Sequence, residues 1–420
     1  MRILILTPQL PYPPHQGTTL RNFNIIKHLA PRHEITLLSF GTPNELRDAA
    51  SLRALCARIE IAPYPARTLA QRAWTTLTSP LPDMALRLQS RAMHAHADAL
   101  LREQFDAIQI EGIEMARYLL TSNFQLPTSK IVFDDHNAEY VLQRTAFESD
   151  VKRLARAHAA LYSLIQWKKL ERYERAICER AHHIVAASDT DTNFIRALFT
   201  NYQLPITTIP NGVDTEFYIP SEEVCAKPPA ELALVFTGKM DFRPNIDAMT
   251  WFCDDILPRI RAEIPLAHIV IVGQKPAPRI AALAHRDGVQ ITGAVPDVRP
   301  FIADAAVYVV PLRMGSGTRL KVLEAMAMGK AIVSTARGVE GIALEPERDA
   351  LIADDPDAFA RAVIALLRDP ARRRALGASA RVRAEADYDW RKIIPAFDQI
   401  YSNIQHPTSN LHASRPISNL

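Results

Sequence analysis

The stretch AVYVVPLRMGSGTRLKVLEAMAMGKAIVST spans residues 306–335. Two continuous apolar runs, 306–311 and 331–335, enclose a glycine-containing loop and an amphipathic segment. Continuous apolar strands that alternate with helices are typical of a parallel sheet covered by helices on both faces. The stretch therefore predicts a strand, a tight loop, a helix and a second strand of an α/β domain.

The same alternation continues outward and forms two series. Apolar runs of the first series occupy 2–6, 35–39, 107–110, 131–133 and 183–187, and the pattern restarts at 233–238, 268–273 and 289–293. Each series predicts one doubly wound, Rossmann-like domain. The segment between them, 206–232, is rich in proline and turn residues, so we place the hinge there.

These patterns divide the chain. We expect an N-terminal domain over 1–205, a C-terminal domain over 206–385, and a C-terminal helix over 386–404 that packs back toward the N-terminal domain. Residues 405–420 are polar and lack periodicity, which predicts a disordered tail. Residues 151–181 carry many charges and helically spaced apolar positions, which predicts a long amphipathic surface helix; a membrane-surface or partner-binding role is the alternative.

Composition excludes several classes of function. A chain of 420 residues with a net charge of only +3 is long enough for two domains and lacks the dense basic field of a nucleic-acid-binding protein. The four cysteines form no CxxC pair, which argues against a zinc ribbon or a disulfide framework and favours a cytoplasmic location. The apolar start MRILIL is too short for a signal peptide, and no run approaches the roughly 20 residues that cross a bilayer. Any membrane contact is therefore expected to be peripheral.

The loop GSGTRLKVLEAMAMG (315–329) has the chemistry of an anion site. Its glycines allow a tight turn, and a helix beginning near Thr318 would present unpaired amide N–H groups and a positive dipole end. Arg319 and Lys321 add cationic donors suited to a diphosphate, and Glu324, expected about two turns into the helix, could accept hydrogen bonds from ribose hydroxyls. The alternative is a glycine-rich loop followed by a solvated charged helix.

Three segments in the same order, IPNGVDTEFY (209–218), FTGKMDFRPNIDAMTWF (236–252) and the 315–329 loop, resemble the donor-binding half of glycosyltransferase family 4 enzymes. The resemblance covers most of residues 1–400. It implies the GT-B fold, two Rossmann-like domains that face each other across a cleft, with the acceptor on the N-terminal side. It also implies a retaining transfer from a nucleotide-sugar donor to a glycan or lipid-linked acceptor in surface polysaccharide or glycoconjugate synthesis, with no cofactor and no protein-bound metal.

The resemblance assigns donor-binding residues, with two departures from the family pattern. Of the family's paired glutamates, Glu324 matches the second, whereas Ser316 stands at the first. Lys239 matches the first of two cationic positions, but Pro244 occupies the second, so Arg243 or Lys321 is expected to compensate. The remaining donor-binding assignments are Gly17, Gly238, Gly317, Thr318 and Arg319.

In the N-terminal half the resemblance points to Gly17 and His136. Gly17 follows the first strand, where loop amides would approach the donor phosphate; a plain strand-to-helix turn is the alternative. His136 follows an apolar strand, where doubly wound sheets place ligand contacts, and relatives carry a histidine facing the donor sugar there. We interpret Asp134 and Asp135 as turn or capping residues and Glu139 as a weaker site candidate. The expected catalytic set is His136, Lys239, Arg243 and Lys321, and no general base is required.

Other patterns point away from rival chemistries. Asp189 and Asp191 mimic the metal-binding DxD motif of other glycosyltransferases, but Ser188 and Asp189 stand where a strand ends and a helix begins, so capping explains them better. The chain has no GxSxG, GxxxxGK[ST] or GxGxxG motif. The alternatives left open are a nucleotide-sugar 2-epimerase of the same fold and a non-catalytic nucleotide-sugar-binding module.

Overall fold

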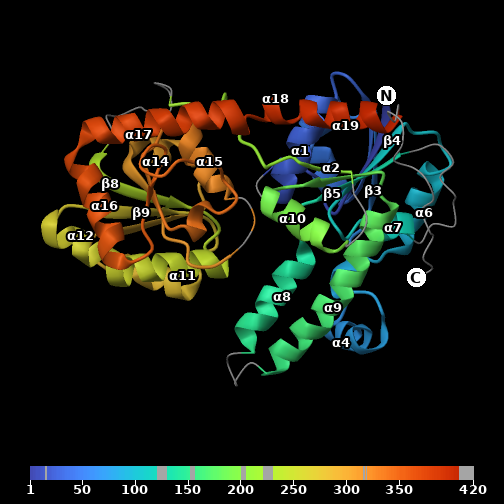
Figure 1. Cartoon of the computed structure of the whole chain (residues 1–420), viewed down its shortest axis with the longest axis horizontal. Helices are drawn as coiled ribbons and strands as arrows, with labels where there is room; N and C mark the ends of the chain where they lie inside the picture. Colours follow the sequence, from blue (N-terminus) through green and yellow to red (C-terminus); the bar gives the residue numbers. More distant parts are fainter. Residues whose placement is uncertain are drawn as a thin grey trace. The chain divides into compact units, whose positions relative to one another are not determined.

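The computed structural model describes residues 1–14, 17–120, 130–151, 157–199, 205–220, 230–315, 317 and 319–405. The chain divides into two compact units (Figure 1). The first contains Met1–Pro210 together with the chain from Ile394 on, and the second contains Asn211–Ile393. The boundary thus lies after residue 210 rather than 205, and residues 386–393 stay with the second unit.

The first unit contains a seven-stranded parallel sheet in the order β3-β2-β1-β4-β5-β6-β7. Its strands are β1 (Arg2–Thr7), β2 (Glu34–Phe40), β3 (Arg58–Ala62), β4 (Ala107–Glu111), β5 (Lys130–Asp135), β6 (His183–Ala186) and β7 (Ile206–Thr208). Its helices are α1 (Gly17–Leu29), α2 (Pro43–Asp48), α3 (Ala50–Leu55), α4 (Leu69–Thr78), α5 (Asp83–Arg87), α6 (Arg91–Leu100), α7 (Arg117–Leu120), α8 (Glu139–Asp150), α9 (Ala157–Arg180), α10 (Asp189–Ala197) and α19 (Pro395–Gln405).

The second unit contains a six-stranded parallel sheet in the order β10-β9-β8-β11-β12-β13. Its strands are β8 (Ala230–Thr237), β9 (His268–Val272), β10 (Val289–Gly293), β11 (Ala305–Val310), β12 (Ile332–Ser334) and β13 (Leu351–Ile352). Its α-helices are α11 (Arg243–Trp251), α12 (Leu257–Glu263), α13 (Pro278–Ala281), α14 (Arg299–Asp304), α15 (Leu320–Ala327), α16 (Pro356–Arg368), α17 (Pro370–Arg383) and α18 (Trp390–Ile393). Shorter π and 3-10 segments are η2 (Phe252–Ile256), η3 (Ala282–His285), η4 (Arg337–Val339) and η5 (Ala384–Tyr388).

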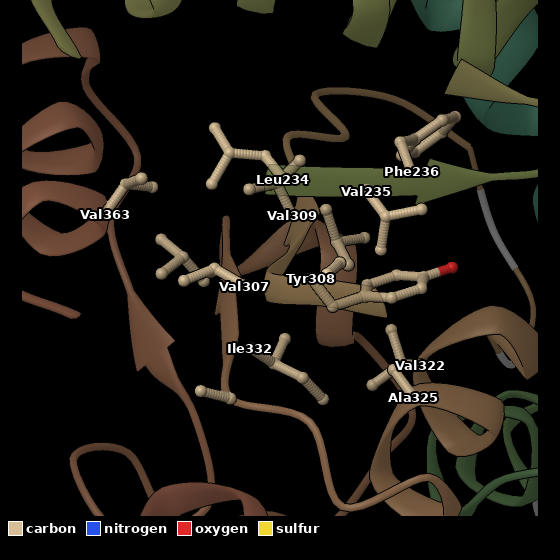
Figure 2. Close-up of a cluster of buried hydrophobic side chains, with 14 of the residues drawn as sticks. Leu234, Val235, Phe236, Val307, Tyr308, Val309, Val322, Ala325, Ile332 and Val363 are labelled. Atoms are coloured by element: carbon tan, nitrogen blue, oxygen red, sulfur yellow. The ribbon is translucent and has the colours of Figure 1, made fainter. Parts of the chain in front are cut away.

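Apolar side chains of β8 and β11 form the centre of the second unit (Figure 2). Tyr308 on β11 points toward Val322 and Ala325 on α15, and all three are fully buried. Val363 on α16 belongs to the same cluster. Helix α15 is therefore held against the sheet by its apolar side, which fixes the direction of the residues on its other side.

The strands that the sequence did not predict are β3, β7 and β13, and each lies at an edge of its sheet. An edge strand is covered less completely than a central one, so its residues need not form a continuous apolar run. The sequence RIEIA of β3 alternates polar and apolar residues accordingly. Strand β7 falls inside the segment that we interpreted as a hinge.

Two predicted helices are divided differently in the structure. Within 151–181, Val151 is the C-cap of α8, and the long helix is α9, which begins at Ala157. The expected helix over 386–404 is instead η5, α18 and α19 in succession. Helix α19 belongs to the first unit, where Asp398 pairs with Arg32 and His33 at 2.6 Å each.

Candidate functional site

The order of strands marks one position in each sheet where a ligand would bind. From β8 the chain moves to β9 and β10 on one side and returns to β11 on the other, so the connections leave β8 and β11 in opposite directions. Strands β1 and β4 have the same relationship in the first unit. Open α/β sheets bind ligands beyond the carboxyl ends of the strands at such a switch point.

At the switch point of the second unit, Lys321 lies over the end of β8. Its Nζ donates a 2.9 Å hydrogen bond to Oδ1 of Asn245 on α11 and lies 3.9 Å from the centre of the Phe236 ring. Gly238 leaves room for this ammonium, because a Cβ at that position would lie 2.7 Å from Nζ. The sequence analysis assigned Gly238 and Lys321 to the donor, and the structure brings them together.

Burial alters the protonation of this lysine. Loss of solvation lowers the Lys321 pKa to about 7, although the carboxylate of Glu324 acts in the opposite direction. A cation held in a partly dry site interacts strongly with an incoming anion, because little solvent screens the charges. Lys321 is therefore suited to a ligand with several negative charges, such as a diphosphate.

Glu324 lies on the same helix face and has a second partner that the sequence analysis missed. Tyr218 donates a hydrogen bond to the Glu324 carboxylate. Burial raises the pKa of Glu324, and the bond from Tyr218 and the charge of Lys321 partly oppose that shift. Helix α15 begins at Leu320, so Glu324 stands little more than one turn into the helix rather than the two turns expected.

The loop before α15 packs against the start of α11. Arg319 is the N-cap residue of α15 and is 8% exposed, and burial lowers its pKa. A Cβ at Gly315 would lie 3.3 Å from two Arg319 nitrogens and 3.4 Å from Pro244. Gly315 and Gly317 have φ of +109° and +78°, a region that favours glycine. Pro244 thus has a packing role at the first turn of α11.

Of four further residues of the predicted donor site, two are exposed and two lie outside the described residues. Lys239 is exposed, with its Nζ 3.9 Å from Asp241 Oδ1, and Arg243 is exposed in the first turn of α11. Both face solvent rather than the buried position that Lys321 occupies. Ser316 and Thr318 lie outside the described residues.

At the switch point of the first unit, His136 is held by a buried carboxylate. Its Nε2 lies 3.0 Å from Oε2 of Glu111, the last residue of β4. Burial raises the pKa of Glu111, and the nearby charge of Asp134 acts in the same direction. Gly112, with φ of +81°, follows at once, and a Cβ there would lie 3.8 Å from Nδ1 of His136. The histidine ring is thus oriented by the end of the neighbouring strand.

The role expected for Asp134 was wrong. Its two oxygens accept hydrogen bonds of 2.8 and 2.9 Å from Arg21 on α1, and both side chains are buried. Asp135 is also a strand residue, and its pKa is raised by burial and by the neighbouring carboxylate of Glu174. Neither aspartate caps a helix or forms a turn. The sequence carried no clear signal for the pair, because the buried side of α1 also includes the polar residues Thr19, Asn22 and Asn24.

Glu111, Asp134 and His136 place three ligand atoms within 4.8 Å of one another, a spacing at which a metal ion could bind. Both oxygens of Asp134 already accept from the guanidinium of Arg21. A cation in that position neutralises the carboxylate and competes with a divalent metal. Among the described residues, the donor set therefore fits an arginine-neutralised histidine site better than a metal centre.

The expected capping at the start of α10 is provided by Ser188, whereas Asp189 and Asp191 stand in the first turn of the helix. Ser188 is the N-cap of α10 and accepts a hydrogen bond from the amide of Asp191. Asp191 in turn accepts one from the amide of Ala138, and Asp189 accepts one from Thr208. Gly17 is the first residue of α1, directly after two residues that the structure does not describe.

Comparison with known proteins agrees with this arrangement. Residues 16–217 match the family described as Glycosyltransferase Family 4, and residues 231–369 match the family described as Glycosyl transferases group 1. The first match covers most of the first unit and extends past its boundary to residue 217, and the second match lies within the second unit. The chain belongs to the glycosyltransferases of the family 4 type.

Curated relatives of this glycosyltransferase include two proteins from bacterial surface-glycan systems. It is 24% identical over 247 residues to the lipopolysaccharide core biosynthesis mannosyltransferase LpcC of Rhizobium leguminosarum bv. viciae, covering 55% of this chain and 67% of that one. It is 20% identical over 409 residues to an uncharacterized 44.6 kDa protein in the cps region of Klebsiella pneumoniae, covering 93% and 97%.

Solved structures show the same fold at low identity. Sucrose-phosphate synthase from Thermosynechococcus elongatus superimposes with a TM-score of 0.70 at 20% identity, over 96% of this chain and 99% of the other. Anabaena HepE, in complex with UDP and glucose, gives 0.64 at 15% identity over 96% and 99%. The glycosyltransferase therefore has the GT-B fold of two parallel-sheet α/β domains. Within the described ranges, every helix falls short of the length or apolar character that a membrane crossing requires.

Proposed function

We propose that this glycosyltransferase moves a sugar from a nucleotide-sugar donor to a glycan or lipid-linked acceptor, with retention of configuration. The observation that carries the proposal is the pair Lys321 and Glu324 on one face of α15, at the switch point of the second sheet. A lysine with a pKa near 7 and a carboxylate held by a tyrosine provide opposite charges for two parts of one ligand. A nucleotide diphosphate has both parts, an anionic diphosphate and a ribose with hydroxyl donors.

The residues of the second unit divide the donor between them. Lys321 meets the diphosphate, with Lys239, Arg243 and Arg319 adding positive charge from the two adjoining loops. The loop amides at Gly238 and Gly317 approach the phosphates closely, because glycines leave the backbone accessible. Glu324 accepts hydrogen bonds from the ribose hydroxyls. Negative charge that develops on the leaving phosphate is thus stabilised by groups already in position.

In the first unit, the loop amides near Gly17 and the imidazole of His136 contact the reacting part of the donor. The bond between the sugar's anomeric carbon and the diphosphate oxygen breaks, and the acceptor hydroxyl oxygen bonds to that carbon on the same face. The acceptor proton passes to the departing phosphate oxygen, so no separate general base is needed. Glu111 orients His136 for its contact with the sugar.

Two lines of similarity support the choice of substrates. HepE has been solved with UDP-glucose, which supports a nucleotide-sugar donor. The lipopolysaccharide core transferase and the cps-region protein support a role in surface polysaccharide or glycoconjugate synthesis. We further propose that transfer needs no metal, because Arg21 supplies the buried positive charge beside Asp134 and the carboxylates of the two DxD aspartates already accept hydrogen bonds from Thr208, Ser188 and the amide of Ala138.

The deciding experiment has two stages. A thermal-shift screen over UDP-, GDP-, ADP- and dTDP-sugars finds the donor, because a ligand that binds only the folded state raises its stability. Turnover of that donor is then followed with and without acceptor glycans, in excess EDTA. Acceptor-dependent transfer with retained anomeric configuration supports the proposal. Donor isomerised without acceptor would indicate a 2-epimerase, binding without turnover a non-catalytic module, and loss in EDTA restored by manganese a metal-dependent enzyme.

A further inference from the structure

Helix α4 of the first unit presents its apolar face to solvent. The side chains of Leu69, Trp74 and Leu77 are 83%, 69% and 76% exposed. All of this helix is described, and none of its residues is buried. Residues four apart align on one side of a helix, so Leu69, Ala73 and Leu77 form a stripe that Trp74 widens.

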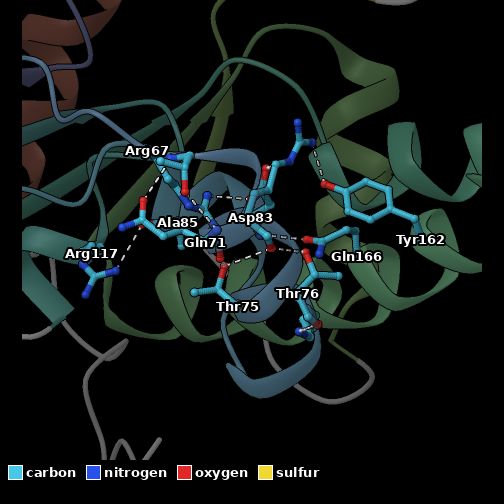
Figure 3. Close-up of polar contacts among 12 residues, drawn as sticks. Arg67, Gln71, Thr75, Thr76, Asp83, Ala85, Arg117, Tyr162 and Gln166 are labelled. Atoms are coloured by element: carbon cyan, nitrogen blue, oxygen red, sulfur yellow. Dashed lines mark hydrogen bonds and ion pairs between the residues drawn. The ribbon is translucent and has the colours of Figure 1, made fainter.

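The opposite, polar face attaches the helix to the protein (Figure 3). Arg72 donates a 2.8 Å hydrogen bond to the Tyr162 hydroxyl on α9 and pairs with Asp83 at 3.1 Å. Thr75 accepts a hydrogen bond from Arg67. A surface helix normally turns its apolar side to the core and its polar side to water. Helix α4 has the reverse orientation.

This orientation is fixed at both ends of the helix. At the start, Thr68 and Gln71 form a capping box with backbone-to-side-chain hydrogen bonds of 2.9 and 3.2 Å. At the end, Nζ of Lys169 donates to the carbonyls of Thr76 and Ser79 at 2.6 and 2.7 Å. Both devices satisfy backbone groups that a helix end leaves open. The apolar face therefore stays outward in the folded enzyme.

Positive charge accompanies this face. Between positions 67 and 91 the sequence has four arginines and a single acidic residue, Asp83. Asp83 pairs with Arg67 and Arg72. Lys169 reaches the end of α4 from α9, and its neighbour Lys168, which pairs with Glu171, has a side chain that is 53% exposed. An apolar helix face with a tryptophan and neighbouring cations is the composition of a helix that lies in the interface of an anionic bilayer.

The size of the apolar face of α4 favours a bilayer over a second copy of the chain as its partner. A stable protein interface buries about 800 Å² on each partner and requires complementary shape. One ten-residue helix with three large apolar side chains offers less area and a convex form. A lipid surface adapts to a convex helix, so it needs no matching groove.

We propose that α4 is a membrane-docking helix that inserts Leu69, Trp74 and Leu77 into the boundary between headgroups and acyl chains of a bilayer containing anionic lipids. Lys168, Lys169 and Arg72 then lie at the level of the phosphates. The proposal stands independently of which acceptor the enzyme uses, because it concerns a surface of the first unit alone.

The test is co-sedimentation of the full chain with vesicles of phosphatidylethanolamine and phosphatidylglycerol, compared with phosphatidylcholine alone. We expect binding to the anionic vesicles that falls at high salt. Replacing all three side chains, Leu69→Ser, Trp74→Ser and Leu77→Ser, should weaken binding at least about tenfold, because each removes a large apolar group from the interface. The matched control is Leu266→Ser in the second unit, which is 76% exposed as Leu77 is, and it should bind as the native chain does.

A conservative variant keeps the test valid if the triple variant misfolds. Brominated lipids should quench part of the native tryptophan fluorescence, and Trp74→Phe should keep vesicle binding while losing that part. Absence of native binding to anionic vesicles, or equal binding by the folded triple variant, would overturn the proposal. So would self-association in solution that the triple variant abolishes while no vesicles are bound, since the face would then serve a second copy.

Discussion

Nζ of Lys321 on α15 donates a hydrogen bond to Oδ1 of Asn245 on α11, at 2.9 Å. The bond joins the two helices whose first turns lie beyond the carboxyl ends of β11 and β8. It also holds the ammonium in the space that the absent side chain of Gly238 leaves. Helix packing thus places the charge before any ligand arrives, so little reorganisation is needed when a diphosphate binds.

Gly238→Ala tests that space. A Cβ at this position would lie 2.7 Å from Nζ of Lys321 and 2.9 Å from Nδ2 of Asn245, so the lysine must move. We expect affinity for the nucleotide diphosphate to fall about tenfold, with a stability loss on the order of 1–3 kcal/mol from the glycine-type φ. Gly341→Ala is the control, because it has φ of +82° but nothing within 4 Å of the new Cβ. Equal loss of affinity in both variants would contradict a specific contact with Lys321.

The lowered pKa of Lys321 predicts proton uptake on binding. At pH 8 an amine with a pKa of about 7 is mostly neutral in the free enzyme. A bound diphosphate favours the ammonium and raises this pKa, so binding at pH 8 should take up close to one proton, and binding at pH 6 almost none. Calorimetry in buffers of different ionisation enthalpy measures the uptake. Lys321→Arg should remove it, because arginine stays charged; the same uptake in that variant would assign the proton elsewhere.

The same shift affects stability in a defined direction. Between pH 7 and the ordinary lysine value of 10.5, the unfolded chain binds more protons at this position than the folded chain does. The contribution of Lys321 to stability should therefore rise with pH across that window and be smallest below pH 7. Lys321→Met should flatten this part of the stability profile. An unchanged profile would show that the lysine is charged in the folded enzyme throughout.

Glu324→Gln keeps the shape of the side chain and removes its charge. If Glu324 binds the ribose, the loss of charge-assisted hydrogen bonds should weaken both the nucleotide diphosphate and the intact donor by about 1–3 kcal/mol. Lys321→Ala should cost more in turnover than in donor binding, because charge on the phosphate grows toward the transition state. Glu263→Gln, at an exposed position, is the control. Unchanged binding and rate in Glu324→Gln would mean that α15 is structural.

His136→Ala should lower turnover by about a hundredfold with little effect on nucleotide affinity, because the imidazole is expected beside the sugar. Glu111→Gln, which leaves the ring in place but weakens the bond that orients it, should give a smaller loss of about tenfold in kcat. Initial rates and titration of the nucleotide diphosphate separate the two quantities. His285→Ala, an exposed histidine of the second unit, is the control. Equal losses in rate and affinity would place His136 elsewhere.

Asp134→Asn removes the carboxylate from the buried guanidinium of Arg21. Breaking a buried ion pair from one side typically costs about 3–5 kcal/mol, so the amides of β5 should exchange with solvent much faster. In the double variant Arg21→Met with Asp134→Leu the penalty should be smaller, because no charge stays buried. Hydrogen-exchange mass spectrometry of peptides covering β1 and β5 measures both. Amide exchange that is as fast or faster in the double variant than in Asp134→Asn would contradict this account.

The sequence by itself determined the repeated central strands, the two Rossmann-like halves and the loop before α15, because buried parallel strands and glycine-containing loops leave continuous local patterns. It also identified Lys321, Glu324 and His136 as candidates, through resemblance to a family whose motifs are contiguous. The edge strands β3, β7 and β13 lacked that pattern, since one side of each is unpaired.

Only the tertiary structure decided which distant residues meet. Asn245 reaches Lys321 across 76 positions, and Arg21 reaches Asp134 across 113. Glu111, Tyr218 and the outward face of α4 likewise depend on how helices and strands pack, not on neighbours in sequence. The physical reason is that burial, charge and exposure are properties of a side chain's surroundings, and those surroundings come from segments far apart along the chain.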